Sequence, residues 1–331
     1  MERTQNQKPI TSFETLGLPT SLEISQLEIK VEWVIENLIP MEAITLLHSI
    51  GGVGKSHLCQ RMGKAIATGG NFFGLETKQM NVFYIDFENP LPEIVDRMKK
   101  IGGAEKFWIW HLGHDPLPIR FDKNEWQIYK TFPPNSVFII DSLRTAHELD
   151  ENSSKDTTFV MNRIKEIRAL GQTFILIHHE SKVGGYRGST AWFDQSDHIL
   201  KFSRVKKVGS DEDEFGDNFD LPIRLGLGGK SRFSSAMDLE PMYFKFESGL
   251  FVLAEDPDIE PLRDTHDLLT EVAENGNPPP GKEDLVKLMM ERLSVTQKKA
   301  RKLLDKGNRI YWNQIIGEKN KTIYVPILGK F

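Results

Sequence analysis

A short glycine-rich segment carries the residue types that bind phosphate. Gly51, Gly52 and Gly54 lead into Lys55 and Ser56, and an apolar run precedes them all. Glycines let backbone N–H groups turn inward around an anion, and the helix that follows points its positive end at the same place. The lysine would reach the β- and γ-phosphates of a nucleotide, and the serine hydroxyl would ligate Mg²⁺.

Ser49 stands where the usual phosphate-loop pattern has its first glycine. Serine makes a tight turn less easily than glycine, but it does not remove an anion site. An ordinary strand–helix turn with a solvated lysine is the alternative interpretation. The residues expected to bind the nucleotide are Ser49, Gly51, Gly52, Val53, Gly54, Lys55, Ser56 and His57.

Carboxylates follow two later apolar runs. Residues 81–85 lead to Asp86 and Glu88, and residues 137–140 lead to Asp141. Because ligands lie at the carboxyl ends of parallel strands, these side chains are expected at the same sheet edge as the phosphate loop. Either Asp86 or Glu88 could accept a proton from a water that attacks the γ-phosphate, and Asp141 has the position that holds Mg²⁺.

His178 and His179 end a further apolar run. Adjacent strand residues point to opposite faces, so the two rings are not expected to chelate one metal ion. His179 is the better candidate for a hydrogen-bond sensor of the γ-phosphate, and a packed core histidine is the alternative.

Two glycine-containing segments carry basic residues. Residues 184–190 include Arg187 and are typical of a flexible loop that faces a passing polymer, or of a mobile surface loop. Lys230 and Arg232 follow two glycines and are predicted to lie on a turn. From there they would reach the γ-phosphate of a neighbouring subunit as an arginine finger, or form an exposed basic turn.

The last part of the chain changes character after a proline-marked linker at 257–261. Helices at 268–273, 282–293 and 294–306, followed by strands at 310–315 and 322–327, predict a winged helix-turn-helix. Residues 294–331 hold nine Lys and Arg against Asp305 and Glu318, whereas the whole chain carries a net charge of −5. This asymmetry favours nucleic-acid binding, although winged helices also bind proteins. Lys298, Lys299, Arg301 and Lys302 would line the recognition helix, and the wing would carry Lys319 and Lys321.

Composition and length set the remaining expectations. A chain of 331 residues has room for one large domain and a smaller one, and the single cysteine, Cys59, excludes a disulfide within the chain. The first nine residues are polar, and no stretch approaches a membrane span, so a cytoplasmic protein without membrane contact is expected. The predicted divisions are an arm or disordered leader at 1–30, an ATPase domain at 31–256 and the basic domain at 262–331.

Residues 31–254 resemble the RecA-like ATPases, and most closely the RepA-type hexameric helicases of plasmids. The resemblance rests on the phosphate loop, Glu88, Asp141, residues 150–153, His178 and His179 with Lys182, and residues 187–189. It implies an α/β P-loop core with a mostly parallel sheet, in which the His179 strand lies between the strands of the phosphate loop and Asp141. It also implies Glu88 as the catalytic base, Asp141 at the magnesium, His179 as sensor, and action in trans by Lys230 and Arg232.

The expected function is Mg²⁺-dependent ATP hydrolysis by a homo-oligomer, in the form of a hexameric ring, that acts on DNA as a replicative helicase. Single-stranded DNA would pass through the ring and contact Lys182 and Arg187. The basic C-terminal domain would bind duplex DNA. One alternative is a DNA-binding regulator that is switched by ATP and does not translocate. Another is a helicase loader or adaptor whose C-terminal domain binds a protein.

Overall fold

The computed structural model describes residues 17–181, 185–186, 188–205, 222–317 and 320–327. By its contacts the chain divides into two units, Met1–Glu32 and Trp33–Phe331. Among residues 17–32 of the first unit, one short helix, α1 (Ser21–Ser25), begins with a capping box formed by Thr20 and Glu23. Three predicted nucleic-acid contacts lie outside the described residues: Lys182, Arg187 and Lys319.

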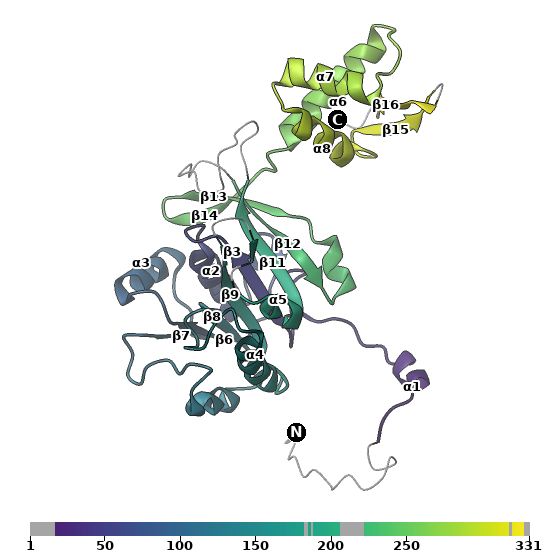
Figure 1. Ribbon diagram of the computed structural model, residues 1–331. Coiled ribbons are helices and arrows are strands. Elements are labelled where there is room, and N and C mark those ends of the chain that lie inside the picture. The colour runs from purple at the N-terminus through teal and green to yellow at the C-terminus, as the bar shows by residue number, and fades with distance from the viewer. Residues whose placement is uncertain (1–16, 182–184, 187, 206–221, 318–319, 328–331) are drawn as a thin grey trace. The chain divides into compact units, whose positions relative to one another are not determined.

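A sheet forms the centre of the second unit (Figure 1). Its parallel strands are, in spatial order, β11 (His198–Arg204), β3 (Ile44–Ser49), β9 (Thr173–Ser181), β8 (Ser136–Asp141), β6 (Asn81–Asp86) and β7 (Phe107–His111). Strand β9 lies between β3 and β8, as the resemblance to RecA-like ATPases implies. The predicted α/β core with a mostly parallel sheet is confirmed.

Antiparallel strands extend the sheet beyond β11, namely β12 (Ile223–Ser231), β13 (Met242–Glu247) and β14 (Leu250–Ala254). The prediction that Lys230 lies on a turn is wrong, because residues 228–231 belong to β12 and Ser231 pairs with His198. Glycine serves close packing here: a Cβ at Gly228 would come within 2.6 Å of the Nε2 atom of His48. Smaller strand pairs are β1 (Trp33–Ile35) with β2 (Ile39–Pro40), β4 (Asn71–Phe72) with β5 (Leu75–Glu76), and β10 (Gly185–Tyr186) with β9.

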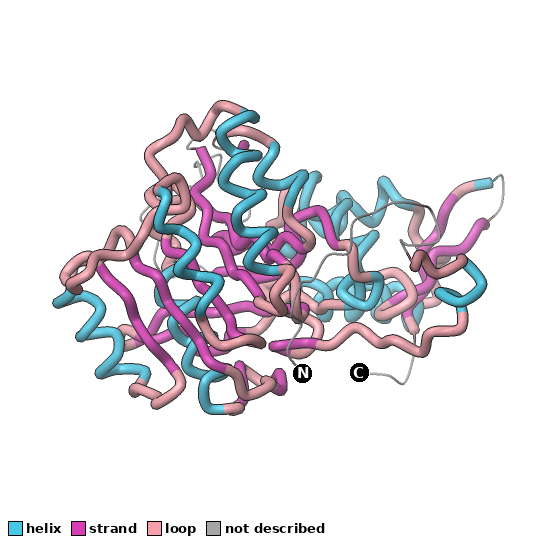
Figure 2. The backbone as a smooth tube through the Cα atoms, turned by 90° about the horizontal axis from the view of Figure 1, so that it is seen from below, coloured by secondary structure: helices cyan, strands magenta, loops and turns pink. Residues whose placement is uncertain are grey.

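Helices cover both faces of the sheet (Figure 2). Alternate residues of a buried strand point to opposite faces. In β3, Leu47 therefore packs with α2 (Lys55–Thr68), whereas Leu46 packs with α4 (Ser154–Arg168). Helix α3 (Leu91–Ile101) lies beside α2; the second face also carries α5 (Ala191–Gln195) and the 3₁₀ helix η2 (Asn124–Thr131). No helix in the described ranges combines the length and the apolar character needed to span a bilayer.

The C-terminal segment forms three helices and a hairpin around a core of its own. The helices are α6 (Ile259–Glu274), α7 (Lys282–Leu293) and α8 (Gln297–Gly307), and the hairpin strands are β15 (Trp312–Ile316) and β16 (Thr322–Pro326). Helix α6 begins within the segment that was predicted as a linker. Pro261 is tolerated there because the first turn of a helix needs no N–H donor from that residue.

Candidate functional site

The phosphate loop joins β3 to α2. Gly52 and Gly54 have φ angles of 81° and 98°, a left-handed conformation that favours glycine. Gly51 and Gly52 are exposed, so the loop backbone can be approached from solvent. Ser49 is buried, and its hydroxyl donates a hydrogen bond of 2.8 Å to the carbonyl of Ile50. Ser49 therefore stabilises the start of the loop through this internal hydrogen bond.

Lys55 is the buried cation at the centre of the loop. Its Nζ atom donates to the carbonyl oxygens of Ser49 and Ile50, both at 3.0 Å, and to the Ser49 hydroxyl at 3.1 Å. Burial lowers the pKa of Lys55 to about 8, although the carboxylate of Asp141 opposes this shift. The ammonium group remains mostly charged at pH 7 and is held where phosphate oxygens would meet it.

Asp141 ends β8 beside the first turn of α2. Its carboxylate accepts hydrogen bonds from Tyr84 Oη at 2.6 Å and Asn89 Nδ2 at 3.1 Å, and also from Ser56. Burial, together with the nearby charge of Asp86, raises the pKa of Asp141 to about 6. A divalent cation would relieve this buried negative charge. The oxygen donors of Ser56 and Asp141 fit Mg²⁺, which prefers oxygen and binds through few protein ligands plus phosphates.

The two carboxylates after β6 lie in different surroundings. Asp86 is fully buried and accepts the backbone N–H groups of Glu88 at 3.0 Å and Asn89 at 2.8 Å. It therefore shapes the turn. Glu88 is partly exposed, accepts a short hydrogen bond from the Ser142 hydroxyl, and lies 3.6 Å from Nε2 of His179.

The pKa of Glu88 is lowered, mainly by its hydrogen bond to His179 and also by Ser142, against the effect of burial. Glu88 is thus ionised at neutral pH and can accept a proton. Of the two carboxylates that the sequence left open, Glu88 has the geometry of a general base.

His178 and His179 point to opposite faces of the sheet. His179 lies on the α2 face, where its Nδ1 atom is 3.3 Å from Nζ of Lys55. His178 is buried on the other face, beside the rings of Trp192 and Phe193. Within the described ranges, no three His, Cys, Asp or Glu side chains are grouped so that they could hold a metal ion.

Lys230 and Arg232 lie near the amino ends of the parallel strands, whereas the phosphate loop follows the carboxyl end of β3. Ser231 pairs with His198, and His198 pairs with Thr45, which is four residues and roughly 13 Å before the loop. Lys230 donates to the carbonyls of Phe193 and Asp194 at 3.2 and 2.7 Å, and Arg232 lies 2.9 Å from Asp197. Neither side chain is near the phosphate loop of its own chain.

Sequence reasoning missed three hydrogen-bond partners of these carboxylates: Tyr84, Asn89 and Ser142. Tyr84 lies in β6 and Ser142 directly follows the neighbouring strand β8, so their contacts depend on strand register rather than on local spacing. Asn89 does have a local signal, because it directly follows Glu88. It donates to both Asp86 and Asp141 and so bridges the two strand ends.

Residues 150–153 and 188–189, both part of the family resemblance, lie together. The N–H group of Ser189 donates to the carbonyl of Glu151 at 2.8 Å, and the hydroxyls of Ser154 and Ser189 are 3.0 Å apart. Arg144 forms an ion pair with Glu151 at 2.9 Å. The structure therefore connects the segment after β8 to the segment after β9.

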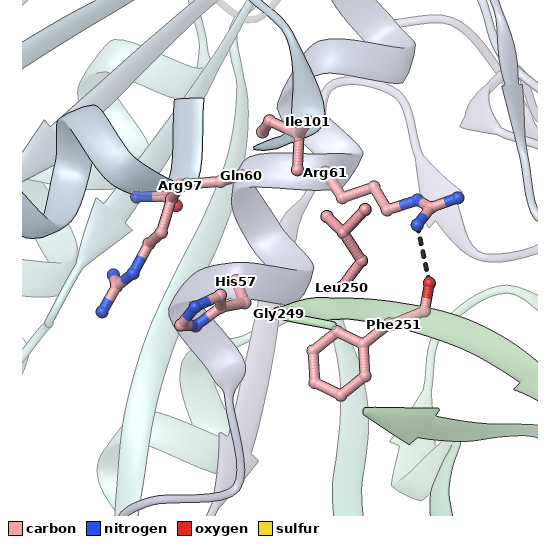
Figure 3. A pocket seen from close by; sticks show the side chains of 8 residues that line it. All are labelled: His57, Gln60, Arg61, Arg97, Ile101, Gly249, Leu250 and Phe251. Carbon is pink, nitrogen blue, oxygen red and sulfur yellow. Dashed lines mark hydrogen bonds between the residues drawn. The ribbon is translucent and has the colours of Figure 1, made fainter. Parts of the chain in front are cut away.

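A pocket opens beside the first turns of α2, between α3 and the β13–β14 hairpin (Figure 3). Its lining residues are His57, Gln60, Arg61, Arg97, Ile101, Gly249, Leu250 and Phe251. Arg61 donates to the carbonyl of Phe251 at 2.6 Å. Gln60 is fully buried, and its amide has no hydrogen-bond partner among the described residues. Burial lowers the pKa of His57 to about 4, so its ring is neutral at pH 7.

The basic residues of α8 divide into two groups. Lys298 and Lys302 are exposed, as is Lys321 beyond the hairpin turn, and Arg301 is exposed but lies 3.0 Å from Glu283. Lys299 instead forms a short ion pair with Asp258. Lys306 lies beside the same carboxylate at 2.8 Å, and 2.6 Å from Asp256. Asp256 and Asp258, at the start of α6, thus neutralise the basic charge on one side of α8.

Comparison with known proteins places the chain in a family. A search of curated proteins returns no match. Among solved structures, the chain resembles the flagellar accessory protein FlaH of Methanocaldococcus jannaschii, with 14% sequence identity and a TM-score of 0.46 over 66% of this chain and 92% of FlaH. It also resembles a KaiC-like protein of Pyrococcus horikoshii OT3, with 14% identity and a TM-score of 0.49 over 68% of this chain and 100% of the other.

The family model AAA_25, described as an AAA domain, matches residues 14–185. The matched stretch contains the phosphate loop, Glu88, Asp141 and His179. Since it covers more than half of the chain, the protein belongs to this AAA domain family.

Proposed function

We propose that the protein is a Mg²⁺-dependent ATPase. The observation that carries the proposal is the convergence of four side chains at the carboxyl ends of four neighbouring strands. Lys55 begins α2 after the loop that follows β3, Glu88 lies two residues beyond β6, Asp141 ends β8, and His179 lies near the end of β9. Each has the charge or hydrogen-bonding capacity that phosphoryl transfer to water needs at that point.

The residues have distinct roles in this proposal. Lys55 and the N–H groups of the loop bind the phosphates, while Ser56 and Asp141 hold Mg²⁺, which offsets phosphate charge when bound. Glu88 orients a water molecule and accepts its proton. His179 contacts both Lys55 and Glu88, so a change at the phosphate end can be transmitted to the base and to β9.

We further propose that the ATPase acts as a homo-oligomer on DNA, as a hexameric helicase of the RepA type in replication. The position of Lys230 and Arg232, far from their own phosphate loop, supports action on the ATP of a neighbouring subunit. The three helices and hairpin support a winged helix-turn-helix at 262–331, with Lys298, Lys302 and Lys321 available to phosphates. The pairing of Lys299 and Lys306 with carboxylates favours, as a second candidate, a C-terminal domain that grips a protein.

The proposal is tested by Lys55→Ala, with Lys64→Ala on the same helix as the matched control. We expect Lys55→Ala to lower ATP hydrolysis at least about a hundredfold and Lys64→Ala to leave it within about twofold. Single-stranded DNA should stimulate the wild-type rate. Unchanged hydrolysis by Lys55→Ala would refute the ATPase, whereas DNA-independent hydrolysis by a strict monomer would refute only the helicase.

A further inference from the structure

A buried polar pair lies directly behind the nucleotide site, on the opposite face of the sheet. Glu180 follows His179 in β9, so the two side chains leave the strand on opposite faces. Glu180 is only 7% exposed, and its Oε1 atom lies 2.5 Å from Nδ1 of His48 in β3. Lys201 of β11 reaches the same oxygen atom at 3.4 Å.

The carboxyl group of Glu180 is ionised in this setting. Its pKa is lowered because the interactions with His48 and Lys201 together outweigh burial. A carboxylate only accepts hydrogen bonds, so Nδ1 of His48 carries the proton and donates it. A buried carboxylate destabilises a fold unless it is paired, and this one is paired across three adjacent strands.

The ring of His48 is confined on its other sides. It makes an edge-to-face contact with Phe193 of α5, with ring centroids 5.2 Å apart. The glycine at position 228 leaves room for the ring, since a Cβ there would lie 2.6 Å from Nε2. The pair thus has one well-defined geometry, which is what a positioning element requires.

The neighbours of the pair on the other face are the residues that hold Lys55. His48 precedes Ser49, and Glu180 follows His179; Ser49 and His179 are register partners. Both of these partners contact Nζ of Lys55. The hydrogen bond between His48 and Glu180 therefore ties together, from behind, the two backbone segments that contact the phosphate-binding lysine.

We propose that Glu180 and His48 are positioning residues that hold His179 between Lys55 and Glu88. Strand β9 ends at Ser181, one residue beyond Glu180, so this pair ties the end of the strand to β3. The inference rests on the proposed ATPase function for its effect on rate, but not for its effect on the position of the His179 ring.

The kinetic test is a double-mutant cycle. Glu180→Ala is expected to lower kcat for ATP about tenfold with KM changed less than about twofold, and Glu180→Gln, which keeps an acceptor for His48, should recover most of the loss. In a His179→Ala background, Glu180→Ala should lower kcat less than about twofold further, because its effect is transmitted through His179. An equal loss in both backgrounds would overturn the proposal.

Controls separate positioning from folding. Leu176→Val changes the packing of the same face of β9 away from the pair and should leave kcat unchanged. Thermal unfolding of each variant reports whether it folds. If Glu180→Ala does not fold, His48→Ala replaces it, because it removes the donor while Lys201 still pairs with Glu180, and the same cycle is measured.

A second readout needs no hydrolysis. Side-chain NMR of histidine-labelled protein, with the His179 signals identified by their loss in His179→Ala, should show those signals shifted in Glu180→Ala and unmoved in Leu176→Val. Unmoved His179 signals in a folded Glu180→Ala protein would overturn the inference. A wild-type protein that hydrolyses no ATP would instead refute the proposed function, and the NMR result would still decide the positioning role.

Discussion

Two edges of the central sheet are defined by the carboxyl and the amino ends of its parallel strands. They differ in how their charged side chains are paired. At the phosphate-loop edge, Lys55 and Glu88 are held by neighbours, and the nearby backbone of Gly51 and Gly52 is exposed to solvent. At the other edge, Arg168 and Arg232 both pair with the buried carboxylate of Asp197, at 2.7 and 2.9 Å. At the first edge the charged groups remain available to a ligand, whereas at the second they pair with one another within the fold.

This difference makes Arg232 the critical residue of the comparison. Its side chain is 57% exposed, so it can leave Asp197 for an external phosphate with little loss of packing. Arg168, with 32% exposure, and Asp197, with 5%, are more firmly built into the structure. Of these three residues, Arg232 is the one that can belong to both the fold of its own chain and the site of a neighbour.

The largest effect is expected for Arg232→Ala. If it acts in trans, hydrolysis should fall about a hundredfold or more, while ATP binding persists. Mixing this variant with Lys55→Ala should restore activity at about a quarter of the interfaces, because an intact loop then meets an intact arginine from its neighbour. A mixture as inactive as its components would contradict the role in trans; Lys245→Ala, on β13, is the control for loss of a strand cation.

Asp197→Ala is expected to lower the stability of the fold. Its carboxylate also accepts the N–H of Ile44 at 3.0 Å, so truncation leaves two cations and a buried amide without their acceptor. A loss of about 3–5 kcal/mol in the free energy of unfolding is expected. Denaturant titration measures it, with exposed Asp194→Ala as the control, and a loss below 1 kcal/mol would show that this edge is not the structural one.

His198 makes the structural edge sensitive to acid. Burial lowers its pKa to about 4, below the value near 6.5 of an unfolded chain. A base with a lowered pKa in the folded state contributes stability that is complete above pH 6.5 and is lost as the pH falls toward 4. The slope of unfolding free energy over that range should become shallower in His198→Gln, and an unchanged slope would exclude the residue as its source.

Asp86 differs from the other charged residues at the ligand edge, because its carboxylate accepts backbone N–H groups of its own turn. Asp86→Asn replaces an acceptor with a donor beside the Asn89 amide and should lower stability by about 1–3 kcal/mol. Hydrolysis measured below the unfolding transition should fall far less than in Glu88→Gln. A larger loss of rate than in Glu88→Gln would reverse the assignment of the two carboxylates.

Much of the site was predictable because its signals are local. Two patterns can be recognised without knowledge of the fold: the spacing of Gly51 to Ser56, and the placement of Glu88 and Asp141 after apolar runs. Strand order followed from the family resemblance, and the parallel sheet then brought these strand ends to one edge.

What escaped prediction depends on register and packing. The His48–Glu180 bond joins residues 132 positions apart, and neither side chain is unusual where it stands in the sequence. Gly228 was interpreted as part of a turn because glycine suits turns and close contacts equally, and only the position of the His48 ring distinguishes them. The start of α6 was missed for a related reason, since proline marks both linkers and first helical turns.

The most direct test of the account is ATP hydrolysis and ATP binding by Glu88→Gln. Glutamine keeps the size of the side chain and an acceptor for Ser142, but it cannot take a proton from water. The account predicts a loss of at least about a hundredfold in the rate of hydrolysis, with the dissociation constant for ATP changed less than about threefold. Hydrolysis at the full rate with normal binding would contradict the central claim that Glu88 is the base of this site.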